Sequence, residues 1–308
     1  MQKKPSENTT IVNMRAKDGL TSGIHQSLKN PAGKIRSSPP YVTSDNIWHG
    51  RLGNQMFKYA SILGISRKQG RTMFIERGTD LEKTFKINYI YTNESIEKWS
   101  VIREKDPVAF DKRLMKLPRN DTRIYGFLQS FLYFADVVDE VRTEFTFHDS
   151  VANEAATILR DIYIKYNVST TVGVHVRRGD FLSDYGQYWG YGVPKKSYFT
   201  KAFSIFKSKF PERRIVFLVA SDDLPWCSKH LHSNDVIVLP PASAAVHLAV
   251  LTSCDHMIIS GGTFGWWSGW LSNGYVIYFS GYMGNGTRLG KTLTISTYYP
   301  LLWVGLGN

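Results

Sequence analysis

The second half of the chain alternates between short apolar runs and longer amphipathic segments. The apolar runs are rich in Val, Ile and Leu and span 171–176, 214–221, 235–240, 256–260 and 275–280, and helix-like segments separate them at 195–210, 224–231, 244–254 and 264–274. Apolar strands that alternate with helices are typical of a parallel sheet covered on both faces. The sequence therefore predicts a Rossmann-like α/β lobe that binds its ligands at the carboxyl ends of the strands.

The first half of the chain begins with a polar segment and continues into a second folded region. Residues 1–44 show almost no hydrophobic periodicity, which predicts a disordered stem or tail. We expect the fold to start near Ile47, because GRLGNQMFKYASILGISRKQGRTMFIE (50–76) indicates a glycine-containing loop, a helix and a strand. Residues 77–120 are charged and irregular, and 149–167 have the length and spacing of a helix that bridges two lobes.

These patterns predict an α/β protein of three parts. The parts are a disordered basic stem over 1–44, an N-terminal lobe over 45–165, and a C-terminal Rossmann-like lobe over 166–308. With 308 residues, of which 43% are hydrophobic, the chain can bury a substantial core.

The charge balance is basic, with 38 Lys and Arg against 26 Asp and Glu, or +12. Seven of these cations, against Glu7 and Asp18, lie in the stem. The chain contains no zinc-finger spacing and no basic heptad region, so the sequence does not favour nucleic acid as a partner. Arginines gathered in motifs favour an anionic small substrate instead.

The sequence gives mixed signals about the compartment. We expect no transmembrane helix or signal peptide, because the chain has no run of about 18 apolar residues and MQKKPSENTT lacks an apolar core. Sequons that begin at Asn8, Asn93, Asn167 and Asn285 mildly favour a secretory lumen. Cys227 and Cys254 lack metal-ligand spacing and form either one disulfide or two buried thiols.

The run TVGVHVRRGDF (171–181) places cationic side chains at the end of a predicted strand. Alternation along the strand puts His175 and Arg177 on the face opposite the valines. Arg177 and Arg178 offer planar donors that suit a diphosphate. The alternative is a salt-bridged turn, in which Asp180 neutralises one arginine and the histidine is an ordinary strand residue.

Two glycine-containing loops open predicted helices. In SGGTFGWWSGWL (260–271), backbone N–H groups and Thr263 can hold an anion at the helix N-terminus, and the three tryptophans have the helical spacing of packing residues. The loop GRLGNQ (50–55) is a second candidate for phosphate contact, or an ordinary tight turn.

Carboxylates also follow or precede predicted strands. In VASDDLPW, Asp222 or Asp223 accepts hydrogen bonds from a base or ribose, or caps the following helix. Asp255 has the geometry to pair with the N1–H and N2–H₂ edge of guanine. The chain contains no Asp-x-Asp triplet, so we predict no metal ligands at the diphosphate.

Taken together, GRLGNQMFKYA, HVRRGDF, VASDDLPWC and SGGTFGWWSGWL resemble, in this order, the alpha-1,2-fucosyltransferase family. HxRRxD is shared with alpha-1,6- and protein O-fucosyltransferases, whereas GTFGWW and GNQMFxYA point to the alpha-1,2 branch. The resemblance implies a GT-B-like fold of two facing Rossmann-like lobes and inverting, metal-independent transfer of fucose from GDP-fucose to the 2-hydroxyl of a galactose-terminated glycan. It implies no cofactor besides this donor substrate.

The resemblance also implies roles for individual residues. Arg177 and Arg178 would bind the GDP diphosphate, His175 the nucleotide sugar, and Asp255 the guanine. Gly53 and Asn54 would approach the fucose-phosphate from the other lobe. The phosphate-contacting loop would consist of Ser260, Thr263 and Phe264, and Asp222 completes the predicted donor-binding set.

The resemblance is less definite about the general base and the location. Deprotonation of the acceptor hydroxyl requires a carboxylate or imidazole within reach, and our candidates are Asp180, which alternatively orients Arg178, and Asp184. Animal relatives resemble type II Golgi proteins, so we expect the Golgi lumen, with membrane association only through an anchor that is absent here. The alternatives are a catalytically silent GDP-sugar or glycan-binding protein and an alpha-1,6 linkage.

Overall fold

A computed structural model describes residues 39–45, 47, 49–88, 90–91 and 95–308 of the chain. Most of the predicted stem lies outside the described residues, as do the sequons at Asn8 and Asn93. The first strand, β1 (Tyr41–Ser44), precedes Ile47, where we expected the fold to start. The sequence missed this strand because its apolar residues are few and a polar segment precedes it.

The N-terminal lobe is built on a five-stranded parallel sheet with the strand order β3-β2-β1-β5-β4. The other strands are β2 (Thr72–Ile75), β3 (Ile90–Tyr91), β4 (Ser100–Arg103) and β5 (Thr122–Tyr125). Helix α1 (Leu52–Gln69) connects β1 to β2. The region we described as irregular therefore supplies β3 and β4 to this sheet.

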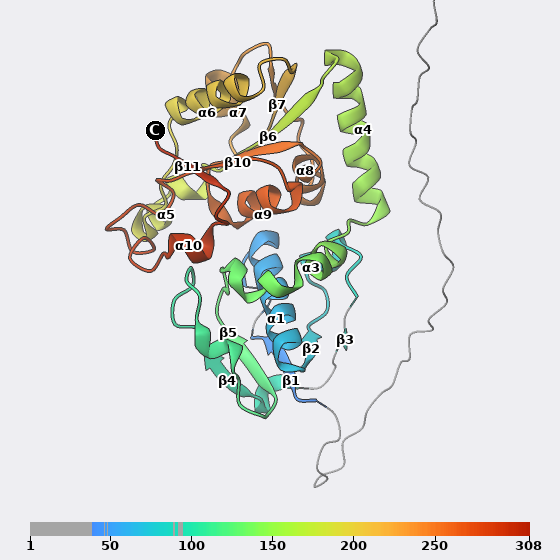
Figure 1. Cartoon of the computed structure of the whole chain (residues 1–308), viewed down its shortest axis with the longest axis vertical. Coiled ribbons are helices and arrows are strands. Elements are labelled where there is room, and N and C mark those ends of the chain that lie inside the picture. The colour runs from blue at the N-terminus through green and yellow to red at the C-terminus, as the bar shows by residue number, and fades with distance from the viewer. Residues whose placement is uncertain (1–38, 46, 48, 89, 92–94) are drawn as a thin grey trace, which may run out of the picture. The chain divides into compact units, whose positions relative to one another are not determined.

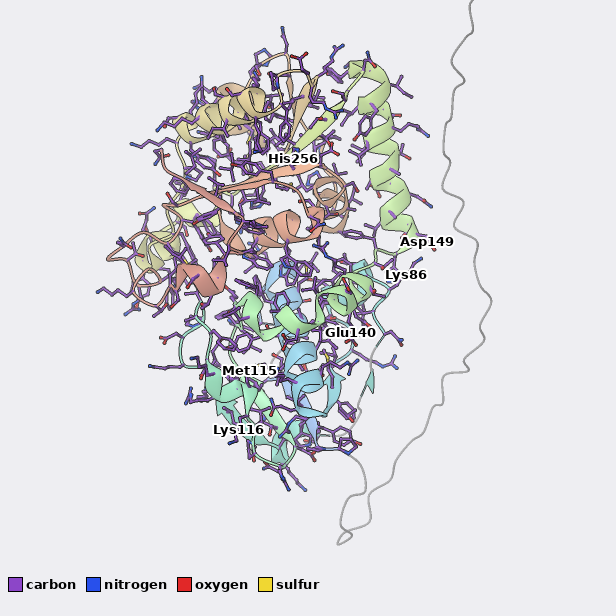
Figure 2. The ribbon with its side chains drawn as sticks, in the orientation of Figure 1. Lys86, Met115, Lys116, Glu140, Asp149 and His256 are labelled. Atoms are coloured by element: carbon purple, nitrogen blue, oxygen red, sulfur yellow. The ribbon has the colours of Figure 1, made fainter. Side chains whose placement is uncertain are left out.

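Short helices fill the rest of the N-terminal lobe. They are α2 (Asp80–Thr84), the 3-10 turns Ile96–Lys98, Lys112–Met115, Phe131–Tyr133 and Ala135–Val137, and α3 (Val138–Glu144). The bridging helix is α4 (Asp149–Tyr166), and the predicted lobe boundary at residue 165 falls at its end. An exposed ion pair between Lys86 and Asp149 ties the start of α4 to the first lobe (Figure 2). Such a pair adds little stability.

The C-terminal lobe contains a six-stranded parallel sheet with the order β11-β10-β9-β6-β7-β8. Its strands are β6 (Thr170–Val176), β7 (Ile215–Ser221), β8 (Val236–Val238), β9 (His256–Ile259), β10 (Val276–Phe279) and β11 (Val304–Leu306). All but β11 were predicted. The two parallel sheets confirm the predicted α/β fold with two lobes.

Helices cover both faces of this second sheet, as Figure 1 shows. On one face lie α6 (Lys196–Lys209) and α7 (Leu224–His230), and on the other lie α8 (Ala244–Thr252) and α9 (Gly262–Ser272). The short helices α5 (Asp184–Trp189) and α10 (Ile295–Tyr298) complete the lobe. The order of strands reverses between β9 and β6, and ligands of such sheets bind at the carboxyl ends of strands at this point.

The two lobes share one apolar core, in which α1 packs directly against α9 (Figure 1). Phe57 of α1 lies 4.6 Å from Trp266 and 5.1 Å from Trp267, measured between ring centroids. Both tryptophan side chains are fully buried, which confirms that they are packing residues. This aromatic contact fixes the N-terminal ends of α1 and α9 next to each other.

Two further sequence questions are answered by the described residues. Cys227 and Cys254 are both buried free thiols, so the disulfide alternative is wrong. Within the described part of the chain, no helix combines the length and the apolar character needed to cross a bilayer.

Candidate functional site

The carboxyl ends of β6 and β9 meet at the point where the strand order reverses. The hydroxyl of Ser260, directly after β9, accepts a hydrogen bond of 2.7 Å from the backbone N–H of Arg177, directly after β6. This bond joins two of the predicted motifs at one edge of the sheet. The structure therefore confirms that RRGD and SGGTFG lie on a common rim.

Arg177 is held by two carboxylates at this rim. Its guanidinium lies 2.6 Å from Asp180 and 3.2 Å from Asp222, and its side chain is 20% exposed. Asp180, a candidate general base whose alternative role was to orient Arg178, pairs instead with Arg177 and, at 3.7 Å, with Arg51 of the first lobe. The Asp180 ion pair of the salt-bridged alternative is therefore present, and it fixes Arg177 in place.

Arg178 points away from Arg177. Its Nε lies 3.1 Å from a carboxylate oxygen of Asp223, and its guanidinium stacks 4.0 Å above the ring of Trp226. Successive residues at the end of a strand project to opposite faces, and Trp226 belongs to α7, on the face opposite α9. The prediction that the two arginines form a single clamp is therefore wrong.

His175 lies on the same face as Arg177, against the first turns of α9. Its ring is 5.5 Å from the ring of Phe264, and a Cβ added to Gly265 would lie 2.4 Å from its Nδ1. This nitrogen is buried without a hydrogen-bond partner in the described structure. Burial, and secondarily the charge of Arg177, lower the pKa of His175 to about 3, so the imidazole is neutral near pH 7.

The N-termini of α1 and α9 meet at the same place. A Cβ on Gly53 would lie 2.7 Å from the backbone N of Phe264 and 2.8 Å from the hydroxyl of Thr263. Only glycine permits this approach. Neither helix has a side-chain cap, so both present backbone N–H groups and the positive end of a helix dipole to the rim.

A chain of hydrogen bonds crosses between the lobes at this junction. The carbonyl oxygen of the Asn54 side chain accepts from Thr263 Oγ1 and from Gln129 Nε2, both at 3.0 Å. Both acceptor positions of this oxygen are therefore occupied, and the orientation of the Asn54 carboxamide is fixed. The predicted residues Gly53, Asn54, Thr263 and Phe264 thus form one contiguous cluster.

The two consecutive aspartates have separate structural roles. Asp223 caps α7 by accepting from the backbone N–H of Trp226 at 3.1 Å, which confirms the capping alternative. Asp222 accepts from the backbone N–H of Arg178 at 2.9 Å and pairs with Arg177. Asp222 therefore shapes the RRG turn, and its carboxylate already has partners in this structure.

Asp184, our candidate for the general base, is the first residue of α5 and is exposed. Its carboxylate makes no hydrogen bond or ion pair with other described residues. One residue, Ser183, separates it from the 3-10 turn Asp180–Leu182, so it lies close in sequence to the loop that carries the arginine motif.

Asp255 lies at the other end of the sheet. It precedes β9, and its carboxylate accepts from the backbone N–H and the hydroxyl of Thr171 at 2.8 and 3.0 Å. Thr171 stands near the beginning of β6, six residues before Arg177, which corresponds to roughly 20 Å along a strand. The prediction that Asp255 joins the nucleotide site is therefore wrong. Its neighbour His256, labelled in Figure 2, packs on Phe210 of α6's C-terminal end.

Sequence reasoning missed two residues at this junction. Arg51 lies within the quoted GRLGNQ motif but was not singled out, and its position before α1 is the available signal. Gln129 lies in an irregular loop after β5, and no pattern in the sequence connects it to Asn54.

A second group of ionisable residues lies in the N-terminal lobe. Burial lowers the pKa of Lys58 to about 8, against the opposing effect of nearby carboxylates, and raises the pKa of Glu104 to about 8. Glu104 accepts from the backbone N–H groups of Phe127 and Leu128, both at 2.9 Å. It therefore fixes the loop that carries Gln129.

The junction itself combines two arginines, two aspartates and two helix N-termini. Within the described residues, no three His, Cys, Asp or Glu side chains are placed so that they could share a metal ion. The junction instead offers Arg177, Arg51 and two helix N-termini, an arrangement that stabilises an anion such as a phosphate.

Comparison with known proteins places these motifs in context. Residues 12–300 match the family model described as glycosyl transferase family 11. The chain is 31% identical over 268 residues to the galactoside 2-alpha-L-fucosyltransferase Sec1 of Mus musculus, covering 83% of this chain and 72% of the relative. It is 32% identical to the galactoside alpha-(1,2)-fucosyltransferase 2 of the same species, covering 83% and 76%.

Solved structures show weaker likenesses. A structure of POFUT1 in complex with GDP-fucose is 13% identical with a TM-score of 0.49, covering 81% of this chain and 97% of that one. The fucosyltransferase NodZ from Bradyrhizobium is 14% identical with a TM-score of 0.47, covering 75% and 92%.

Proposed function

The chain belongs to glycosyl transferase family 11, and we therefore propose that it transfers L-fucose from GDP-fucose to the 2-hydroxyl of a terminal galactoside. The observation that carries this proposal is the similarity, over 83% of the chain, to relatives named galactoside alpha-1,2-fucosyltransferases. The junction of Arg177 with the N-termini of α1 and α9 supports it, because the reaction needs a site for a nucleoside diphosphate.

The proposed donor site lies between Arg177 and the first turn of α9. The diphosphate oxygens would exchange with the carboxylates that now hold Arg177 and would accept from Thr263 and the free N–H groups of α9. As the bond between fucose and phosphate breaks, negative charge grows on the GDP oxygens. Fixed positive groups stabilise this charge in the transition state, typically by about 2.7 to 4 kcal/mol for one such donor.

His175 would act in this site as a neutral hydrogen-bonding group. Because its pKa is lowered to about 3, it carries no positive charge near pH 7. It is therefore unsuited to neutralise phosphate, and its position beside Phe264 suits contact with the nucleotide sugar.

The proposal includes inversion at the fucose C1 and independence from metal ions and cofactors. A single displacement inverts the centre and needs one general base at the acceptor hydroxyl. Asp184 is retained as the candidate, since it is exposed on the loop after the arginine motif. The arginine and the helix N-termini would supply the positive charge that other transferases take from a metal.

We further propose that the protein works in the Golgi lumen, as its family resemblance suggests. The sequons at Asn167 and Asn285 support a secretory location, because both asparagines are exposed and therefore accessible to glycosylation. Treatment of the secreted or membrane-associated protein with a glycosidase that removes N-glycans should lower its apparent mass.

The deciding experiment is incubation of the protein with GDP-fucose and a panel of galactosides. We expect GDP release that depends on acceptor, and linkage analysis should find fucose on the galactose 2-hydroxyl. Binding of GDP-fucose without acceptor-dependent release would identify a catalytically silent binding protein. Fucose at a 6-hydroxyl would identify the alpha-1,6 alternative, and either result would overturn the proposal.

A further inference from the structure

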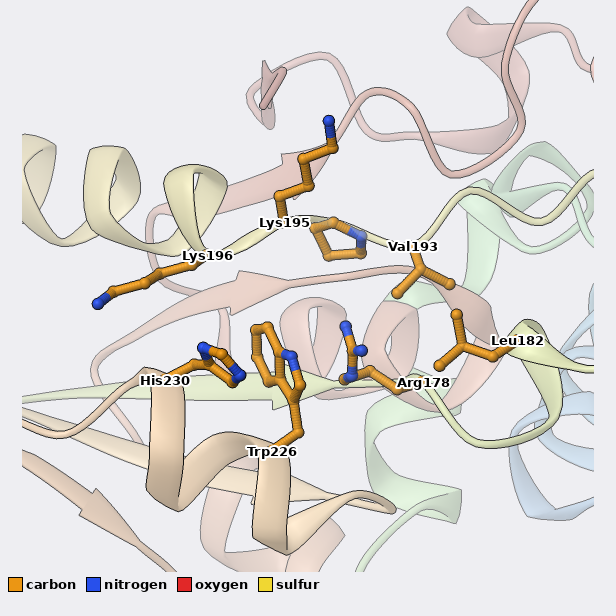
Figure 3. A pocket seen from close by; sticks show the side chains of 8 residues that line it. Arg178, Leu182, Val193, Lys195, Lys196, Trp226 and His230 are labelled. Carbon is orange, nitrogen blue, oxygen red and sulfur yellow. The ribbon is translucent and has the colours of Figure 1, made fainter.

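Arg178 is not used by the proposed donor site. The donor site lies on the α9 face of the sheet, with Arg177, Ser260 and Thr263. Arg178 projects to the other face, where it stacks on Trp226 of α7 and lies beside the start of α6 (Figure 3). The side chain of Arg178 is only 15% exposed, and donor binding does not explain why a cation is placed on this face.

The guanidinium of Arg178 is rigid but only partly satisfied. Its Nε is bound to Asp223 at 3.1 Å, and its plane lies 4.0 Å above the Trp226 ring, which also contacts His230. Its two terminal amino groups make no hydrogen bond with any described residue. An arginine that is held at Nε and open at both amino groups is preorganised for a bidentate oxyanion.

These free donors face a cavity of about 300 Å³, at the small end of the range for ligand sites. Apolar side chains form its walls, namely Leu182, Val193, Pro194 and Trp226. His230 also lines it, and Lys195 and Lys196 lie at its rim with their ammonium groups directed away from Arg178 (Figure 3). Among the described residues, no carboxylate lines the cavity. The three cations outnumber the two carboxylates bonded to Arg178, those of Asp222 and Asp223, which leaves an excess of positive charge.

We propose that this cavity binds an oxyanion, a sulfate or carboxylate, carried by the acceptor saccharide. Arg178 would form the bidentate bonds, Lys195 and Lys196 would add charge, and the apolar walls would contact the sugar ring. The acceptor is favoured over the nucleotide because the donor cluster lies on the opposite face of β6. This inference rests on the proposed function and adds to it a preference for acidic galactosides.

The test compares two acceptor saccharides in the fucose transfer catalysed by the intact protein. One is a β-galactosyl disaccharide, and the other is the same disaccharide with a sulfate on its second sugar. We expect the sulfated acceptor to have a KM about tenfold lower, the size of effect typical of one good charge-assisted contact. The double variant Lys195→Ala/Lys196→Ala should reduce this preference to about twofold, and Arg178→Lys, which keeps the charge but loses the fork, should reduce it as well.

The matched control is Lys229→Ala, an exposed lysine of α7 that does not line the cavity. It should keep the full preference for the sulfated acceptor. Equal KM values for the two acceptors in the wild-type protein would overturn the proposal. So would a double variant whose affinity for GDP falls as much as its affinity for the sulfated disaccharide, since this would assign the cavity to the nucleotide.

A binding measurement separates this inference from the proposed function. Calorimetric titration of the sulfated disaccharide into the GDP-loaded protein requires no turnover. We expect the double variant to bind about tenfold more weakly than the wild-type protein. If neither acceptor is fucosylated, the proposed function fails, but the titration still decides whether the cavity binds the anion. Equal affinities of the wild-type protein and the double variant for the sulfated disaccharide would reject the anion site.

Discussion

The two arginines at the C-terminal rim and the pair Lys58 and Glu104 of the N-terminal lobe are held in opposite ways. At the rim of the C-terminal sheet, Arg177 and Arg178 are each neutralised by an aspartate within 3.2 Å and retain some exposure. In the N-terminal lobe, Lys58 and Glu104 are largely removed from water, and burial shifts the pKa of each to about 8. The ion pairs near solvent favour the charged forms of the arginines and aspartates. Burial favours the neutral forms of Lys58 and Glu104.

This difference distinguishes groups that can bind a ligand from groups that hold the structure together. A paired arginine near solvent can exchange its carboxylate for a phosphate at little cost, because both states are charged and hydrated. A buried carboxyl group that accepts two backbone N–H bonds cannot exchange partners without leaving the loop unsatisfied. We therefore expect substitutions in the C-terminal rim to change activity and those in the N-terminal lobe to change stability.

The largest expected effect is that of Arg177→Ala. It removes the cation at the donor junction, so kcat/KM for fucose transfer should fall on the order of 100-fold or more. The fold should persist, because the side chain lies at the rim and the two aspartates it leaves reach solvent. Steady-state kinetics and far-UV circular dichroism measure the two properties.

A matched control for this change is Arg213→Ala, since Arg213 is an exposed arginine outside the rim. Its activity should stay near the wild-type value. Near-normal turnover of Arg177→Ala would show that this arginine has a structural role and does not act on the donor. The proposed contrast between the rim and the N-terminal lobe would then be wrong.

Gly53→Ala tests the junction that joins the lobes. Alanine favours a helix by about 1 kcal/mol over glycine, but its Cβ would lie 2.7 Å from backbone atoms of Thr263 and Phe264. Backbone atoms of a packed helix cannot move aside easily, so we expect a net destabilisation of about 1 to 3 kcal/mol. Urea unfolding measures it.

The control is Gly284→Ala, because the nearest atoms to its added Cβ are 3.9 Å away. This variant should unfold at nearly the wild-type urea concentration. If Gly53→Ala proved as stable, α1 and α9 would have to separate more readily than their shared aromatic core suggests.

Glu104→Gln tests the buried carboxyl group by its pH dependence. The folded-state pKa, about 8, lies above the ordinary value of 4.5, so the native state binds the proton more tightly. Its stabilising contribution is complete below pH 4.5 and is lost as the pH rises to about 8. Relative to Glu104→Gln, the wild-type free energy of unfolding should fall by up to about 1 kcal/mol per pH unit in this window.

Urea denaturation between pH 5 and 8.5 measures both proteins under the same conditions. Glu76→Gln is a suitable control, since this carboxylate also lies near Lys58 and its side chain is only half-buried. If the free energies of unfolding of the wild type and Glu104→Gln changed in parallel with pH, Glu104 would be ionised over this whole range. Burial would then not favour its neutral form, and the contrast with the arginines of the rim would not hold.

The same contrast explains what could be predicted from the sequence. The strands of the C-terminal lobe are buried on both faces, so their apolar runs are continuous and their loops carry recognisable motifs. The arginines, the α9 loop and Asn54 could therefore be found. The strands β3 and β4 could not, because they are short, lie at sheet edges and mix polar with apolar residues.

Long-range contacts account for the remaining errors. The bond between Gln129 and Asn54 joins residues 75 positions apart, and no local pattern encodes it. Asp255 was assigned to the guanine from the family resemblance, although it stands at the amino end of β9 and ligands of parallel sheets bind at the carboxyl ends. Its partner Thr171 lies 84 positions away.

The smallest expected effect on the donor site is that of Asp255→Ala, which tests this correction. The carboxylate accepts two hydrogen bonds from Thr171 at the end of the sheet opposite Arg177. Its loss should lower the free energy of unfolding by about 1 to 3 kcal/mol, because the buried strand N–H is left without a partner. The affinity for GDP, measured by calorimetry, should change less than twofold, because the variant alters nothing at the donor junction. Thr171→Val provides the control. It removes the hydroxyl, which donates to the Asp255 carboxylate and accepts from the Asp255 backbone N–H at 3.2 Å, but it leaves the strand N–H bonded to Asp255, so it should cost less. A GDP affinity that fell tenfold in Asp255→Ala would return this residue to the nucleotide site and require the guanine to bind at the amino end of the sheet.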